Sequence, residues 1–267
     1  MRWSEVKRPI VCLAPMDGVT NTAYRQIVRR LNPEVILFSE FTSVDGLVRS
    51  ERVRTKLDYD PSEQPLFMQL FGNNPQMFAE AAKMVEQRGM MGVDINMGCP
   101  AKKIVHSQHG SALMKDPDTA CRIIESIRNN CGLQVSVKTR LGWKNEDGLI
   151  DFCRSLQSAG TSMITIHGRT YSQAFKGVAN WEPIYELKNH LQIPLLGSAV
   201  MPLGIHGVFR IQKNILNLFW ERESESHSIT MGSYAKSSRN GSRSKNSANT
   251  LGIMSTVSSM PKPGGRV

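Results

Sequence analysis

The 267-residue sequence has no uninterrupted apolar run of the ~18 residues that a membrane-spanning helix needs. Its first residues include no apolar segment of the kind that a secretory signal carries. The five cysteines are scattered and contain no Cys-x-x-Cys pair, which argues against both a disulfide framework and a thiolate zinc site. We therefore expect a protein of a reducing compartment, the cytoplasm, with no membrane partner.

Acidic residues are missing from the end of the chain, where none follows Glu225. Residues 201–267 contain nine Lys or Arg and three Glu, so they carry +6 of the formal net charge of +10. A basic balance favours a polyanionic partner such as nucleic acid. The same segment is rich in Ser, Asn and Gly, a composition that buries too little apolar surface to order itself. We predict an atypical tail over 201–267 with at most one helix, at 204–220, and disorder beyond it.

Strand-like apolar runs alternate with helical periodicity through residues 1–200. The predicted strands are residues 10–14, 35–38, 66–70, 92–95, 134–138, 162–166 and 193–196. The predicted helices begin near Thr20, Pro75, Pro117, Leu149 and Glu182. Such alternation predicts βαβ units and a parallel sheet.

Two parallel architectures compete, a doubly wound open sheet and a closed barrel. No Gly-x-Gly-x-x-Gly follows the first predicted strand, which disfavours the open nucleotide-binding sheet. Seven strand–helix units over roughly 195 residues approach the ~250 residues of an eight-fold barrel. We therefore predict an α/β fold of the TIM (β/α)8 type over residues 1–200. It stops after the seventh strand, because no convincing eighth strand follows, and an open edge would remain.

Polar or chemically distinctive residues stand at the ends of the predicted strands. They are Pro15 and Met16 after the first strand, Gln69 at the third, Asn96 and Cys99 at the fourth, Lys138 and Arg140 at the fifth, and His167 at the sixth. In a parallel barrel the carboxyl ends of the strands form the active-site face, so we expect these side chains to converge. An unpaired buried ammonium is costly, so Lys138 needs an anionic or carbonyl partner. An amide, a cation and an imidazole suit a flat, electron-rich heterocycle, with Cys99 as a proton donor on the opposite wall.

His106 and His109 lie three residues apart, a spacing that two metal ligands can have. A protein metal site normally uses at least three protein ligands. No third ligand stands at a plausible spacing, so we predict no metal site.

Several segments occur together in a characteristic order and spacing. They are Ala14-Pro15-Met16-Asp17-Gly18-Val19-Thr20, Gln69-Leu70-Phe71-Gly72, Asn96-Met97-Gly98-Cys99-Pro100, Val137-Lys138-Thr139-Arg140 and His167-Gly168-Arg169-Thr170. Over about residues 8–197 the sequence resembles the tRNA-dihydrouridine synthases, flavin enzymes that reduce uridine in tRNA. Lys102-Lys103 and Gly110-Ser111-Ala112-Leu113, after the cysteine, also look like that family.

The resemblance implies FMN as cofactor, tRNA as partner and NADPH as reductant, with NADH left open. The sequence does not determine the oligomeric state, and we expect a monomer. The residues it assigns to FMN are Pro15, Met16, Asp17, Gln69, Lys138 and His167. Asn96 would hold the target base, and Lys102 and Arg140 would contact the substrate. A phosphate contact suits Lys102, because Lys and Arg neutralise RNA phosphates.

The reaction of that family gives Cys99 its expected role. Reduced FMN can deliver a hydride to C6 of the uracil ring, and the resulting enolate needs a proton at C5. A thiol with an ordinary pKa near ~8.5 is mostly protonated at neutral pH and can serve as that acid. A folded tRNA buries its bases, so the uridine must be extruded to reach the flavin.

The resemblance ends at Leu196-Gly197-Ser198-Ala199-Val200-Met201. In the family the seventh strand leads into an Asn-Gly-Asp turn and the eighth into a Gly-Arg turn, which together hold the FMN phosphate. Neither turn is recognisable here, nor is the helical domain that grips tRNA. Two alternatives therefore stay open: a catalytically impaired truncation of such an enzyme, or another FMN barrel oxidoreductase that acts on a small pyrimidine.

Overall fold

The structure is a computed structural model, and it describes residues 3, 6, 10–198 and 253–256. The predicted helix at 204–220 and most of the predicted disordered tail lie outside the described residues. In the part that is described, the longest helix, α4 (Pro75–Gln87), has 13 residues, and no helix is long and apolar enough to cross a membrane.

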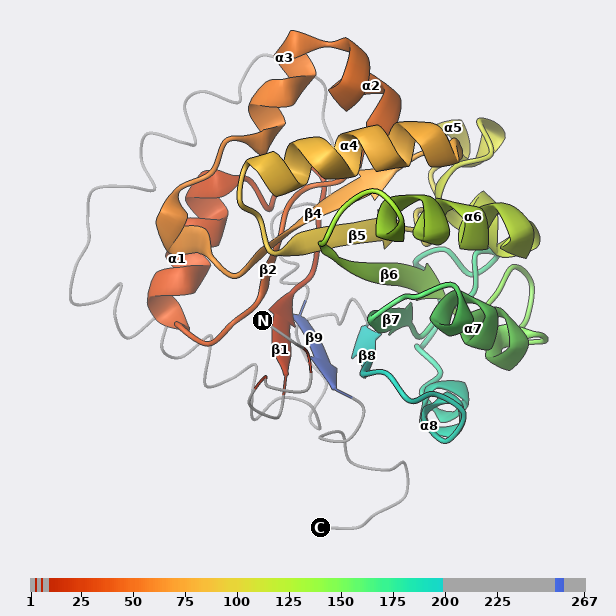
Figure 1. Cartoon of the computed structure of the whole chain (residues 1–267). Coiled ribbons are helices and arrows are strands. Elements are labelled where there is room, and N and C mark those ends of the chain that lie inside the picture. Colours follow the sequence, from red (N-terminus) through yellow and green to blue (C-terminus); the bar gives the residue numbers. More distant parts are fainter. Residues whose placement is uncertain (1–2, 4–5, 7–9, 199–252, 257–267) are drawn as a thin grey trace, which may run out of the picture.

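The described chain is built around a curled parallel sheet with helices on its outside (Figure 1). Its parallel strands are β1 (Val11–Leu13), β2 (Leu37–Phe38), β4 (Leu66–Phe71), β5 (Gly92–Asn96), β6 (Gln134–Arg140), β7 (Met163–His167) and β8 (Leu195–Ser198). Neighbours from β2 to β8 pair in parallel, and β1 joins β2 through a parallel bridge between Cys12 and Ile36. A short strand, β3 (Thr42–Ser43), pairs with the end of β4. The seven predicted strands and the barrel-type parallel fold are therefore confirmed.

One further strand corrects the prediction at the end of the chain. β9 (Ile253–Thr256) lies between β8 and β1 and is antiparallel to both. The prediction of disorder is wrong for these residues, and so is the prediction of an open edge after β8. Strand edges present unpaired N–H and C=O groups that favour pairing with an extended segment. Such pairing uses the backbone, so the composition of residues 253–256 gave little indication of it.

Helices cover the outside of the sheet. They include α1 (Thr22–Leu31), α4, α6 (Pro117–Arg128), α7 (Leu149–Ser158) and α8 (Glu182–Lys188), close to the predicted positions. Side chains of Asn21, Asn74 and Asp116 cap the first turns of α1, α4 and α6 by accepting hydrogen bonds from backbone N–H groups. The stretch between β3 and β4, which had no predicted element, contains α2 (Val44–Arg49) and α3 (Glu51–Arg54).

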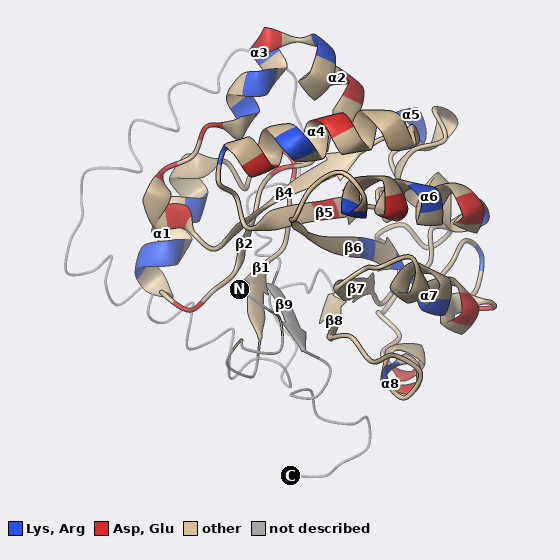
Figure 2. Ribbon diagram, in the orientation of Figure 1, with Lys and Arg blue, Asp and Glu red and all other residues tan. Residues whose placement is uncertain are grey.

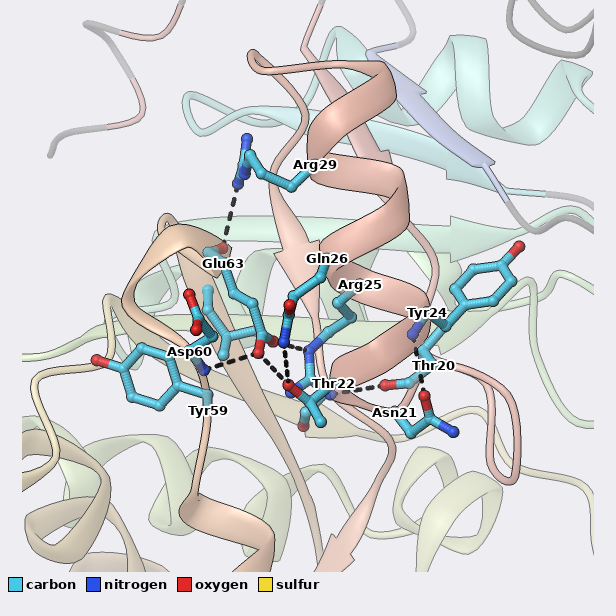
Figure 3. Close-up of polar contacts among 12 residues, drawn as sticks. Thr20, Asn21, Thr22, Tyr24, Arg25, Gln26, Arg29, Tyr59, Asp60 and Glu63 are labelled. Atoms are coloured by element: carbon cyan, nitrogen blue, oxygen red, sulfur yellow. Dashed lines mark hydrogen bonds and ion pairs between the residues drawn. The ribbon is translucent and has the colours of Figure 1, made fainter. Parts of the chain in front are cut away.

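A buried ion pair ties α1 to the turn that precedes β4 (Figure 3). The Nε of Arg25 donates to Glu63 over 2.6 Å, and the N–H of Asp60 donates to the same carboxylate over 2.8 Å. The hydroxyl of Thr22 donates to Glu63 as well. Every oxygen of the fully buried Glu63 carboxylate is thereby hydrogen-bonded, which offsets the cost of burying its charge.

Two apolar clusters lie on the two faces of the sheet. The larger one packs the strands against the outer helices. The smaller one includes Trp3, Phe38, Phe67, Met163 and Leu196 and lies on the inner face. Gly92 makes room there, since a Cβ on it would lie 2.3 Å from the Phe67 ring. The amino-terminal end of the barrel is thus filled by apolar side chains, with Trp3 donating from Nε1 to the hydroxyl of Ser162 over 3.2 Å.

Candidate active site

Polar side chains occupy alternate positions of the inner strand faces. Successive residues of a strand point to opposite faces, and residues in register on parallel neighbours share a face. The register brings together Gln69, Asp94 and Ser136 in one row, Asn96, Lys138 and Thr165 in the next, and Arg140, His167 and Ser198 in a third. The acidic residue of β5 and the basic residues of β6 stand out among otherwise uncharged central strands (Figure 2). Four of the residues predicted to converge, Gln69, Asn96, Lys138 and His167, therefore share the interior.

The loop after β5 is held closed by Asn96. The Oδ1 of Asn96 accepts from the backbone N–H of Gly98 over 3.1 Å and from that of Cys99 over 2.9 Å. Gly110 lies against the cysteine with a φ of +60°, and a Cβ on it would lie 3.0 Å from the Cys99 carbonyl oxygen. Both the positive φ and the close approach of the Cys99 carbonyl require glycine at position 110.

Cys99 is half-buried, and burial raises the pKa of its thiol. Asp17, on the loop after β1, raises this pKa further, while Arg140 and Lys138 lower it. Burial is the largest of these influences, so the thiol is protonated at neutral pH. Asp17 is exposed, and its charge nevertheless acts on the Cys99 thiol.

Lys138 projects from β6 into the interior. Burial, and to a smaller extent Arg140, lowers the pKa of its ammonium to about 8, whereas Asp94 acts in the opposite direction. Its ammonium makes no hydrogen bond or ion pair with any residue that the structure describes. The adjacent hydroxyl of Thr165 is also buried and without a hydrogen-bond partner there. Two polar groups are thus available to a ligand in the interior.

His167 is a neutral imidazole. The Nη1 of Arg169 lies 3.3 Å from its Nε2, and a guanidinium can only donate, so Nε2 accepts and the proton sits on Nδ1. Burial lowers the pKa of His167 to about 2, and the positive charges of Lys138, Arg140 and Arg169 add to the effect. His167 therefore presents an N–H donor without a charge.

Arg140 makes contacts that favour a supporting role over direct substrate contact. Its side chain is buried and donates to the carbonyl oxygens of Gly98 over 2.7 Å, Thr170 over 3.1 Å and Ala174 over 2.8 Å. These bonds join the Cys99 loop to the loop after β7. Burial lowers the pKa of Arg140 to about 10, so the guanidinium stays charged at neutral pH.

The remaining predicted residues lie at the rim. Pro15 and Met16 are half-buried on the loop after β1, where the Thr20 hydroxyl donates to the Met16 carbonyl and accepts from its N–H, each over 3.0 Å. Lys102 is exposed at the start of α5 (Lys102–His106), directly after the cysteine loop. Among the described residues, no group of three or more His, Cys, Asp or Glu could hold a metal ion.

Asp94, Ser136 and Thr165 also lie in the interior, although the sequence predicts them only as parts of strands and not as site residues. The spacing along the strands could have indicated them, because residues two apart on a strand point to the same face. Each stands two residues before a predicted site residue of its strand: Asp94 before Asn96, Ser136 before Lys138, and Thr165 before His167.

A parallel barrel with polar side chains at the carboxyl ends of its strands defines a large class of enzymes. Two solved structures show this fold. A 2-naphthoyl-CoA reductase complex has a TM-score of 0.55 and 11% identity, and the match covers 69% of this chain and 43% of that one. A morphinone reductase mutant in complex with tetrahydroNAD has a TM-score of 0.50 and 8% identity, and the match covers 76% of this chain and 80% of that one. Residues 12–198 match the model of the family described as Dihydrouridine synthase (Dus). The chain belongs to this family.

Individual relatives agree with the family match. The chain is 38% identical over 189 residues to a "Probable tRNA-dihydrouridine synthase 1" of Synechocystis sp., covering 70% of this chain and 53% of the relative. It is 37% identical over 193 residues to a "Probable tRNA-dihydrouridine synthase" of Rhodobacter capsulatus, covering 71% and 59%. A Staphylococcus aureus protein of that name is 35% identical over 190 residues, covering 70% and 58%. The chain thus spans between half and three fifths of these curated relatives.

Proposed function

We propose that this chain is the catalytic barrel of an FMN-dependent tRNA-dihydrouridine synthase of the cytoplasm. It would reduce a uridine of tRNA to 5,6-dihydrouridine, with NADPH as the reductant. The observation that carries the proposal is the pairing of a protonated Cys99 thiol, held in a closed loop, with a Lys138 ammonium in the same barrel mouth that has no partner among the described residues. The names of the relatives support the choice of tRNA as substrate.

The interior residues fit a flavin. The Lys138 ammonium and the Thr165 hydroxyl are polar groups that lack protein partners among the described residues, and His167 offers a neutral N–H. We assign the flavin ring to these groups and to Gln69, with Pro15 and Met16 along its edge. A bound reduced flavin supplies the hydride for C6 of the uracil ring. Lys138 adds positive charge beside that electron-rich ring.

Cys99 then donates its thiol proton to C5 of the same uracil, so that one hydride and one proton complete the reduction. The thiolate left behind is stabilised by Arg140 and Lys138, whose charges lower the pKa of Cys99, and solvent returns the proton. Asn96 orients the loop so that the thiol faces the ring. An extruded uridine is required, because a folded tRNA buries its bases.

Lys102 fits a contact with the RNA backbone outside the barrel. It is exposed at the beginning of α5, three residues after Cys99, and Lys103 beside it is exposed too. A cation at this point would meet a phosphate next to the extruded base. The formal net charge of +10 agrees with a polyanionic substrate.

Substitution of Cys99 tests the proposal. With unmodified tRNA, FMN and NADPH, Cys99→Ala should lower dihydrouridine formation by about 10²–10⁴, the usual contribution of a positioned general acid. Reduction of the flavin by NADPH should continue, because the thiol acts after it. Cys131→Ala, at a half-buried cysteine outside the barrel mouth, is the matched control.

Two results would contradict the proposal. Equal product from the Cys99→Ala variant and the unsubstituted chain would reduce Cys99 to a structural residue. Turnover of free uracil or dihydroorotate with none of tRNA would favour an oxidoreductase of small pyrimidines instead.

A further inference from the structure

A buried carboxylate that the proposed reaction does not use lies in the centre of the barrel. Asp94 is 1% exposed and stands on β5 between Gln69 of β4 and Ser136 of β6. Its Oδ2 accepts from the Nε2 of Gln69 and its Oδ1 from the hydroxyl of Ser136, each over 2.6 Å. Charge-assisted bonds of this length are among the stronger ones in proteins.

The bond from Gln69 continues towards the cysteine. The Oε1 of Gln69 accepts from the Nδ2 of Asn96 over 3.0 Å, and the Oδ1 of Asn96 holds the N–H groups of Gly98 and Cys99. Four members therefore form one chain of hydrogen bonds: Asp94, Gln69, Asn96 and the Cys99 loop. Ser136 is attached to the same carboxylate but lies off this path.

The direction of every bond in the chain is determined. A carboxylate can only accept, so Gln69 must turn its NH2 group towards Asp94 and its oxygen towards Asn96. Asn96 must then donate to Gln69 and turn its own oxygen to the backbone N–H groups of the loop. Both amide side chains are thus fixed in the one orientation that closes the cysteine loop.

We propose that Asp94 is a positioning residue, whose carboxylate orients Gln69 and Asn96 and through them holds the Cys99 loop closed. The importance of this role rests on the proposed function, because in that reaction the Cys99 thiol has to reach the uracil of the substrate. Packing alone does not account for the residue, since an uncharged side chain would fill the same place without the cost of burying a charge.

The charged and titratable groups that face Asp94 are consistent with an ionised carboxylate at neutral pH. Burial raises the pKa of Asp94 to about 6, against the hydrogen bonds from Ser136 and Gln69 and the positive charge of Lys138. The carboxylate of Asp94 also acts on Cys12 of β1, whose thiol pKa is raised mainly by burial and further by this negative charge. Cys12 therefore stays protonated and does not compete for the charge.

The test measures how well the cysteine loop is closed, in the full chain and without flavin or tRNA. The rate of Cys99 alkylation by iodoacetamide is followed by mass spectrometry and divided by the rate of Cys131 in the same sample. Asp94→Ala removes the acceptor and should raise this ratio about tenfold, as expected when roughly one net hydrogen bond no longer closes the loop. Gln69→Met breaks the same path one step later and should have the same effect.

Three variants separate positioning from packing. Asp94→Asn keeps an acceptor for Gln69 and should stay within about twofold of the unsubstituted ratio. Ser136→Ala removes the bond that lies off the path and should do the same. The double variant Asp94→Ala with Gln69→Met should equal either single one, because two changes on one path do not add.

The inference is overturned if Asp94→Ala leaves the ratio unchanged, if Ser136→Ala raises it equally, or if the double variant gives the product of the single effects. Should Asp94→Ala fail to fold, Gln69→Met and Ser136→Ala decide the matter: a rise in the first alone supports the inference, and equal ratios refute it. The proposed function fails separately, by absence of dihydrouridine from the unsubstituted chain, a result that leaves the alkylation ratio untouched.

Discussion

The neutral imidazole of His167 makes a defined contribution to the pH dependence of stability. In the folded protein its pKa is about 2, because it is buried and faces Lys138, Arg140 and Arg169. In the unfolded chain it should titrate near its ordinary value of 6.5. Below that pH the unfolded chain binds a proton that the folded protein does not, so the free energy of unfolding falls as the pH falls.

The magnitude follows from the pH interval. Between pH 6.5 and pH 5.0 the loss amounts to about 2 kcal/mol, at about 1.4 kcal/mol for each pH unit. The stabilisation is fully present above pH 6.5 and continues to decline down to about pH 2, where the folded protein also binds the proton. Lower pH values are less suitable, because carboxylates of ordinary pKa begin to titrate there too. Asp94, with a pKa of about 6, titrates inside the chosen interval, so only the difference between the protein and a His167 variant is informative.

His167→Gln isolates this contribution. The glutamine oxygen can still accept from Arg169, but the side chain carries no titratable group. Urea unfolding at pH 7.5 and pH 5.0 gives the free energy of unfolding by linear extrapolation. Between the two pH values the unsubstituted protein should lose about 2 kcal/mol more than the variant. His190→Gln, on the outer layer after α8, controls for the loss of an imidazole as such.

Equal losses in the unsubstituted protein and in His167→Gln would refute the reasoning. They would mean that His167 accepts a proton in the folded state as readily as in the unfolded chain. The imidazole would then be a cation beside Lys138 at low pH, and the assignment of His167 as an uncharged donor would be wrong.

Two further predictions concern the flavin and the closing strand. Lys138→Met should lower the reduction potential of bound FMN and weaken its binding, because the ammonium stabilises the anionic reduced ring; a redox titration that finds no change would place the lysine elsewhere. Ser255→Pro should lower the free energy of unfolding by about 1–3 kcal/mol, because proline removes a backbone N–H inside a paired strand. Ser255→Ala, which keeps the N–H, should leave the thermal midpoint nearly unchanged, and equal midpoints for both variants would argue against β9.

The sequence was sufficient for the parallel architecture, and the reason is physical. Runs such as Leu66–Phe71 and Met163–His167 are buried on both faces, so they are recognisable without knowledge of their neighbours. The starts of α4 and α6 were also predictable, because Pro75 and Pro117 occupy first-turn positions directly after the capping residues Asn74 and Asp116. β9 could not be found in this way, since its place depends on which strand edges remain unpaired.

The sequence predicted most residues of the candidate site, but not the hydrogen bonds between them. Strand ends alone indicated that Gln69, Asn96, Lys138 and His167 would meet, and the register brings them together. The assignments of these residues to flavin and base remain predictions. Arg140 was expected to contact the substrate, but no pattern in the sequence shows that its guanidinium spans two loops. Hydrogen-bond direction is likewise a property of several strands at once.

The antiparallel course of β9 changes where the chain enters and leaves the barrel. In a regular βαβ unit, each connection carries the chain from the active-site rim to the opposite rim. Here β8 ends at Ser198 on the active-site rim, and β9 begins at Ile253 opposite Leu13, on the same rim. The chain therefore leaves β8 and enters β9 at the same rim, the one that also holds Cys99. An eighth strand entered from the opposite rim, as in a regular βαβ repeat, would run parallel to β8 and β1 instead.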